Sequence, residues 1–132
     1  MSDYPMGLYW VLDENHNAVP TDLETWAKMC GNREMKIVKQ EYRWHWWWVS
    51  TVFLGLDHNW DDGPPHLFET MIFFHGGKHH YADIYQDRYS TWDEALAGHQ
   101  LVVKRFPVIL ASHYLGELRY ALRRFWRRIR GK

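Results

Sequence analysis

The sequence feature that most constrains the fold is the run at residues 44–54, which reads WHWWWVSTVFL. Large apolar side chains occupy both of its alternating sets of positions. Alternate residues of a strand point to opposite faces of a sheet, so this pattern is typical of a central strand that is buried on both sides. The run therefore predicts a sheet that has strands on either side of this segment.

Further segments have the character of strands that pair with this run. Residues 33–43 have mixed polarity and are expected to form an edge strand, whereas residues 67–74 are apolar on both faces. Residues 81–85 follow a glycine turn, and residues 8–12 form another short β-type run. Because short loops join the three strands from residue 44 onward, we expect an antiparallel meander.

Two capping boxes mark the starts of helices. In each, a threonine precedes a glutamate by three residues, at residues 21–24 and 91–94. The first helix has an apolar stripe that includes Cys30, which we expect to be a buried, inert thiol. The second keeps an apolar stripe until Pro107, which is expected to break it.

A heptad pattern follows this proline. Apolar residues recur at alternating intervals of three and four, as in the a and d positions of a coiled coil. We call this set the seam; it consists of Val108, Ala111, Leu115, Leu118, Leu122, Phe125 and Ile129. The arginines of the segment fall outside the seam. We expect a basic amphipathic helix that docks on the sheet, joins two subunits, or binds nucleic acid or an anionic membrane surface.

Length and composition support one folded domain. The chain has 132 residues, of which 46% are hydrophobic and 24% charged, and these values exclude wholesale disorder. We expect an α+β fold in which an antiparallel meander of about four or five strands is packed by short capped helices. Residues 1–106 are assigned to this domain. Residues 107–132 are assigned to the basic C-terminal helix, docked on the body or at an interface.

Charge is unevenly divided along the chain, although the net charge is zero. Residues 104–132 hold nine Lys/Arg and one acid, a balance of +8; residues 1–103 hold seven and fifteen, a balance of −8. An acidic body with a basic tail suits self-association, and the tail also suits phosphates. No apolar run approaches the roughly 18 residues of a membrane span. A single cysteine excludes an internal disulfide framework, so we expect a cytoplasmic protein.

Three motifs stand in a distinctive order. The first is VSTVFLGLDHN at residues 49–59, and the second is GPPHLFETMIF at residues 63–73. The third consists of RYSTW at residues 88–92, EA at residues 94–95 and GH at residues 98–99. Together they resemble an uncharacterised family of small phage and prophage proteins. The resemblance implies phage or prophage origin, a compact α+β domain and an infected or lysogenic bacterial host, and it carries no activity. The tryptophans of residues 44–48 and the basic helix depart from the family pattern.

Four side chains are candidates for acid–base or metal chemistry. Asp57 and His58 lie on a loop after the central strand, where an aspartate can orient a histidine as a general base or both can bind a metal. Glu69 lies in an apolar strand, so it either pairs with Arg88 or is available for catalysis. His99 lies on an apolar helical stripe as a core histidine, or points into a pocket with the other three.

Metal and cofactor signals are weak. His75, His79 and His80 surround a glycine turn, but their spacing matches no zinc signature. No nucleophile, P-loop or dinucleotide motif is present, so we expect no cofactor unless these histidines or the acid–base group hold a metal.

The surplus of tryptophan and tyrosine favours a binding surface. The candidate binding residues are Trp60, Arg88, Tyr89, Arg123, Trp126 and Arg127. We therefore expect a small phage accessory protein that binds rather than catalyses, in host takeover or anti-defence. Its partner is a host protein, a defence component or its small-molecule signal, or a second copy. The alternatives are a small His/Asp/Glu hydrolase, metal-dependent or not, and nucleic-acid or membrane-surface binding through residues 119–132.

Overall fold

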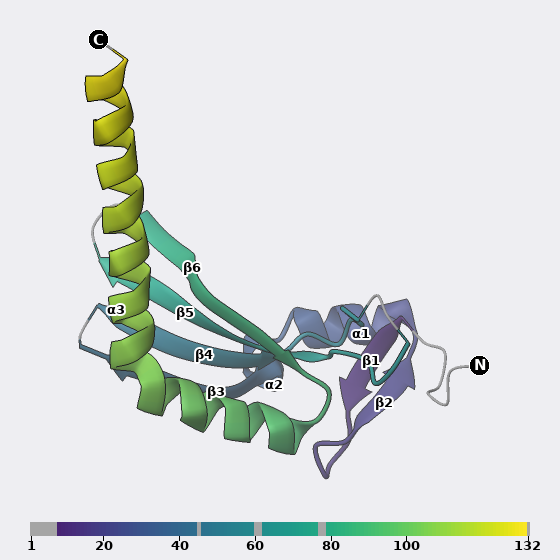
Figure 1. Ribbon diagram of the computed structural model, residues 1–132. Coiled ribbons are helices and arrows are strands. Elements are labelled where there is room, and N and C mark those ends of the chain that lie inside the picture. The colour runs from purple at the N-terminus through teal and green to yellow at the C-terminus, as the bar shows by residue number, and fades with distance from the viewer. Residues whose placement is uncertain (1–7, 45, 60–61, 77–78, 132) are drawn as a thin grey trace.

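The computed structural model describes residues 8–131 except 45, 60–61 and 77–78, and of residues 75–83 it describes at most the backbone. The elements follow one another along the chain in the order shown in Figure 1. They are β1 (Tyr9–Leu12), β2 (Ala18–Thr21), α1 (Leu23–Cys30), α2 (Arg33–Lys36), β3 (Ile37–Arg43), β4 (Trp47–Phe53), β5 (Phe68–Gly76), β6 (His79–Tyr89) and α3 (Trp92–Arg130).

The main sheet is an antiparallel meander with strand order β3-β4-β5-β6, which confirms the α+β prediction. β1 and β2 form a separate hairpin. The segment expected as one edge strand, residues 33–43, instead begins with the short helix α2, which Asn32 caps by accepting a hydrogen bond from the N–H of Glu34. A local side-chain cap thus competes successfully with strand pairing over these first residues.

The two faces of β4 differ in burial. Trp47, Val49, Thr51 and Phe53 are buried, whereas on the opposite face Ser50 is buried and Trp48 and Val52 are half-buried. The prediction of a strand buried on both sides is therefore correct for one face only, because α3 covers one side and the other side stays partly open.

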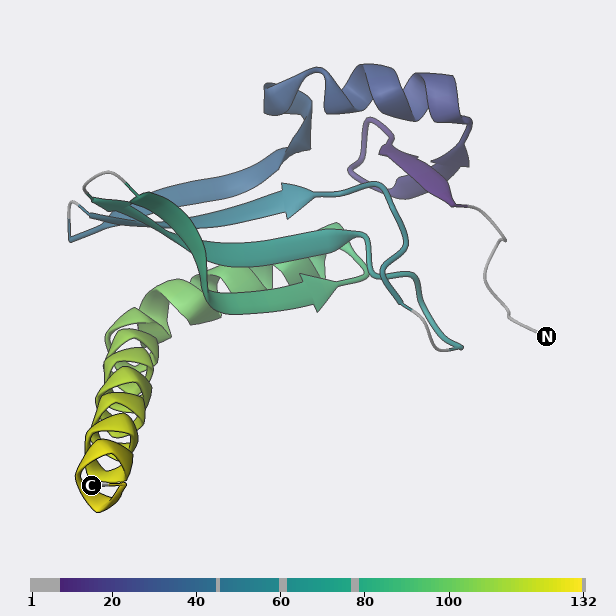
Figure 2. The same ribbon diagram turned by 90° about the horizontal axis from the view of Figure 1, so that it is seen from above.

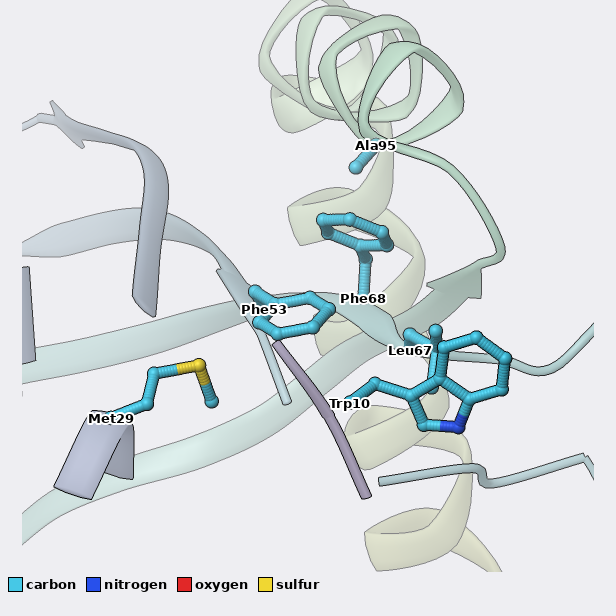
Figure 3. Close-up of a cluster of buried hydrophobic side chains, with 6 residues drawn as sticks. All are labelled: Trp10, Met29, Phe53, Leu67, Phe68 and Ala95. Atoms are coloured by element: carbon cyan, nitrogen blue, oxygen red, sulfur yellow. The ribbon is translucent and has the colours of Figure 1, made fainter. Parts of the chain in front are cut away.

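The core consists of two clusters. One gathers at the hairpin end of the sheet, where Trp10, Met29, Phe53, Leu67, Phe68 and Ala95 meet from different elements (Figure 3). The other lies between the sheet and α3 and contains Trp47, Val49, Ile72, Val102, Phe106 and Leu110. Cys30 is half-buried, so the expectation of a buried thiol is wrong; Met29 is the buried residue of α1.

Both helix starts are capped by side chains. In α3, Thr91 accepts a hydrogen bond from the N–H of Glu94 at 3.1 Å, as the capping box predicts. In α1 the cap is Asp22, one residue later than expected, and it accepts from the N–H of Thr25 at 2.7 Å.

α3 runs without interruption through Pro107, so the expectation that this proline breaks the helical pattern is wrong. Figures 1 and 2 show that the helix first crosses the sheet and then changes direction, so that its C-terminal part projects away from the sheet. A proline inside a helix removes one backbone hydrogen bond and bends the axis, which accounts for the change of direction. We call residues 111–130, beyond the last buried residue of α3, the arm.

Gly55 joins the hairpin to the sheet. Its carbonyl accepts a hydrogen bond from the N–H of Trp10 at 2.8 Å, and the indole Nε1 of Trp26 donates to the neighbouring carbonyl of Leu54 at 3.1 Å. Gly55 has φ of +69°, and a Cβ here would stand 2.6 Å from the Trp10 carbonyl oxygen and 2.7 Å from the Trp26 indole nitrogen. Only glycine satisfies both the backbone conformation and the space.

We expect Gly55→Ala to lower the free energy of unfolding by about 2 kcal/mol or more, because it combines a strained φ with backbone and indole overlap. Chemical denaturation followed by tryptophan fluorescence measures this change. Gly116→Ala, at a helical glycine with no atom within 4 Å of an added Cβ, is the matched control and is expected to leave stability unchanged or raise it by up to about 1 kcal/mol. Equal effects of the two substitutions would contradict this role of Gly55.

Candidate functional site

His99 lies at the centre of a buried chain of polar side chains. Its Nδ1 is 2.7 Å from the hydroxyl of Thr51, which is 2.6 Å from the hydroxyl of Thr70, and its Nε2 is 3.2 Å from a carboxylate oxygen of Glu41. A carboxylate only accepts, so Nε2 carries the proton and Nδ1 accepts from Thr51. Thr51, Thr70 and His99 are fully buried, and each has a hydrogen-bond partner, so this chain orients α3 on the sheet.

Burial lowers the pKa of His99, and the neighbouring Glu41 opposes this effect only in part. Burial also acts to raise the pKa of Glu41, but hydrogen bonds from Lys39 and His99 outweigh it and hold that pKa below its ordinary value. The favoured state therefore pairs a neutral histidine with an ionised glutamate.

Glu69 has its own partners on the other face of the sheet. Its carboxylate is 3.0 Å from Nε of Arg88 and 2.7 Å from the side-chain nitrogen of Gln86. Glu69 and Thr70 are consecutive in β5 and therefore point to opposite faces. Since Thr70 lies on the His99 side, the sheet separates Glu69 from His99, and the pairing of Glu69 with Arg88 is the structural alternative predicted from the sequence.

Asp57 organises the loop after β4. Its side chain accepts from the N–H groups of Asn59 and His66 at 2.8 and 3.1 Å. His58 lines a small hollow of about 240 Å³ together with Trp26 and Cys30. Among the described residues, no hydrogen bond or ion pair joins Asp57 or His58 to Glu69 or His99.

The other site residues predicted from the sequence do not gather in one place. The ring of Tyr89 packs against Gly98 of α3 so closely that a Cβ added at Gly98 would overlap the ring. Tyr89 therefore holds α3 against β6 and does not face outward. Trp60 lies outside the described residues, as do the side chains of His75, His79 and His80. Within the part of the chain that the structure describes, no group of three His, Cys, Asp or Glu side chains could hold a metal ion.

A groove of about 390 Å³ lies between the β1–β2 turn and the start of α3. His16 stacks on Trp92 beside it, with ring centroids 3.9 Å apart and planes 7° from parallel. The predictions from sequence did not include this groove; Pro64 and Pro65, which line it, belong to the motif at residues 63–73.

The arm presents the most extended apolar surface of the described chain. The large seam residues of the arm are about half exposed, from 48% for Leu122 to 56% for Leu118. The predicted binding residues Arg123, Trp126 and Arg127 lie on the same arm and are also exposed. Tyr114 and Tyr120, at 56% and 60% exposure, belong to this surface as well and were not singled out from the sequence.

The seam is a different face of α3 from the one that packs on the sheet. The buried stripe of α3 is Ala95, His99, Val102, Phe106 and Leu110. Consecutive helical residues are about 100° apart, so Ala111, the seam residue next to Leu110, points away from the stripe. The seam therefore faces away from the body, which explains why the body leaves it uncovered.

The arginines occupy the remaining surface of the arm. They are Arg119, Arg123, Arg124, Arg127, Arg128 and Arg130, and all are exposed. The described residues offer none of them an ion-pair partner. The guanidinium of Arg124 lies 5.8 Å from the centre of the Tyr120 ring, and both line an open hollow of about 570 Å³ with Arg127 and Arg128. The arm is thus apolar on one side and cationic on the other.

Comparison with known proteins finds no family model, no curated protein and no solved structure that matches this chain. No helix among the described residues is both long enough and apolar enough to cross a membrane.

We expect the protein to lose stability as pH falls below about 6.5, the ordinary pKa of histidine, because the unfolded chain protonates His99 more readily than the folded one. The contribution of His99 is fully present above that pH and is lost toward its lowered folded-state pKa. Urea unfolding at pH 7.5, 6.5 and 5.5 measures how steeply the free energy of unfolding depends on pH. These values extend about one unit to each side of the ordinary pKa of histidine.

His99→Gln is expected to flatten this slope, whereas the matched control His113→Gln, at a histidine on the arm, is expected to leave it unchanged. An unchanged slope in His99→Gln would contradict the assignment of this pH dependence to His99.

Proposed function

We propose that this protein acts by binding rather than by catalysis, and that it associates with a second copy through the seam of its arm. The main support for this proposal is that the seam is exposed along the part of α3 that projects away from the sheet. Leucines at heptad spacing that are exposed to water in one chain are stabilised when a second helix packs on them and removes them from water. The hydrolase alternative has less support, because Asp57, Glu69 and His99 have separate structural partners.

The residues that flank the seam are compatible with a parallel pair of arms, which we propose. In heptad notation Leu115, Leu122 and Ile129 are a positions, and Leu118 and Phe125 are d positions. A g residue of one parallel helix meets the following e residue of the other. These pairs are Tyr114 with Arg119 of the second copy, and Ala121 with Trp126 of the second copy. Neither pair brings like charges together.

Four of the other five arginines of the arm point away from a partner helix, whereas Arg128 is at a g position beside the seam. Arg123, Arg124, Arg127 and Arg130 fall at b, c and f positions, which point away from a partner helix. Pairing therefore buries the seam without bringing these charges into the interface. Full burial of one leucine contributes roughly 1.5–3 kcal/mol, so several leucines from each copy can offset the cost of association.

The resemblance to phage and prophage proteins supports an accessory role inside a bacterial host. We propose that the protein contacts a host or defence component as a pair, because the seam residues of the arm are exposed in the described chain.

Sedimentation velocity of the full chain tests the association. We expect a dimer that dissociates on dilution, and we expect Leu118→Ser combined with Leu122→Ser to raise the dissociation constant by about 100-fold or more, because four leucines per dimer are lost. Tyr120→Ser is the matched control, because Tyr120 is similarly exposed but lies at an f position. A wild-type monomer up to about 100 μM, a range that covers weak dimers, would contradict the proposal, as would an equally strong effect of Tyr120→Ser.

A further inference from the structure

We propose that the arginine face of the paired arms binds the phosphate backbone of a nucleic acid. This inference rests on the proposed association, because pairing covers the seam and leaves Arg123, Arg124, Arg127 and Arg130 pointing outward. It assigns a partner to the part of the arm that self-association does not use.

The spacing of the arginines fits a repeating anion. Arg119, Arg123 and Arg127 follow one another at intervals of four residues, which is about 6 Å along the helix axis. One strand of a duplex carries a phosphate about every 3.4 Å along its axis. Because the strand also winds around that axis, successive phosphates lie farther apart in space than this rise, and their separation is of the same order as that of the guanidinium groups in the row; Arg130 extends the same side of the helix.

The arginines are free to make such contacts. They have no ion pair within the described residues, and Glu117 is the only acid of the arm. A guanidinium group donates two parallel hydrogen bonds to a phosphate, which a lysine cannot do. All six basic residues of residues 111–130 are arginines.

The hollow lined by Tyr120 adds a second kind of contact. Arg124, Arg127 and Arg128 surround it, and the Tyr120 ring forms part of its wall. An aromatic ring beside guanidinium groups suits a sugar or base next to a bound phosphate. The acidic body limits the footprint to the arm, since residues 1–103 carry a balance of −8, seven basic against fifteen acidic residues.

Pairing and phosphate binding are expected to support each other. Each arm contributes six arginines and one acid, a balance of +5, so a pair brings two like-charged helices together. A bound polyanion neutralises this charge and favours the pair, and thermodynamic linkage requires the pair to favour the polyanion equally. Without nucleic acid, added salt should therefore strengthen pairing, whereas with nucleic acid it should weaken binding.

Fluorescence anisotropy with a labelled duplex DNA of mixed sequence tests the proposal, with the full chain at several salt concentrations. Affinity is expected to fall as salt rises. Arg123→Gln, Arg124→Gln and Arg127→Gln combined should lower affinity at least about 10-fold near 100 mM salt. They should also make the log–log salt dependence shallower by about three for each arm that contacts the DNA. Lys104→Gln with Arg105→Gln, on the exposed side of the body half of α3, is the matched control and should leave affinity within about twofold.

Sedimentation of the same variants separates the two proposals. The triple arginine variant is expected to remain a dimer; if it does and loses DNA binding, the arginine face is supported. If the wild-type protein is a monomer and still binds DNA through these arginines, the self-association proposal is contradicted and the nucleic-acid proposal is not. The nucleic-acid proposal is overturned by no DNA binding at low salt, by unchanged binding of the triple variant, or by binding only to vesicles of anionic phospholipid that is lost in Leu118→Ser/Leu122→Ser.

Discussion

The packing of the first half of α3 on the sheet determines how the rest of the molecule is used. Phe106 and Leu110 bury the helix beside Trp47, and His99 joins it to the sheet through hydrogen bonds. Beyond Leu110 no further residue of the helix is buried, while the bend near Pro107 carries the arm away. The body thus packs against the base of the arm and leaves its apolar seam in solvent, which is an arrangement suited to binding.

Much of the fold could be predicted from local patterns. The meander, the helix cap at Thr91 and the helical heptads after Pro107 follow from alternation, capping chemistry and spacing, which act within a few residues. The continuation of α3 through Pro107 could not, because a proline normally disfavours a helix interior. Here Phe106 and Leu110 on either side are buried, and this tertiary packing outweighs the loss of one backbone hydrogen bond.

The candidate site was harder to predict, for a physical reason. Whether His99 and Glu69 share a pocket depends on which face of the sheet α3 covers, and two consecutive strand residues point to opposite faces. Glu69 faces away from α3 and pairs with Arg88, whereas His99 is buried with Thr51. The seam was visible in the sequence, but its exposure was not, because that depends on how far the buried stripe of the helix extends.

The central claim is that two arms pair in parallel through the seam, and distance measurement by pulsed electron resonance tests it most directly. A spin label is placed in turn at Tyr120→Cys and Arg127→Cys, both at f positions, in a Cys30→Ala background. A parallel pair in register predicts the same distance between labels at the two sites, because equivalent residues face each other at every heptad. Clearly different distances at the two sites, or no dipolar coupling between copies, would contradict the account.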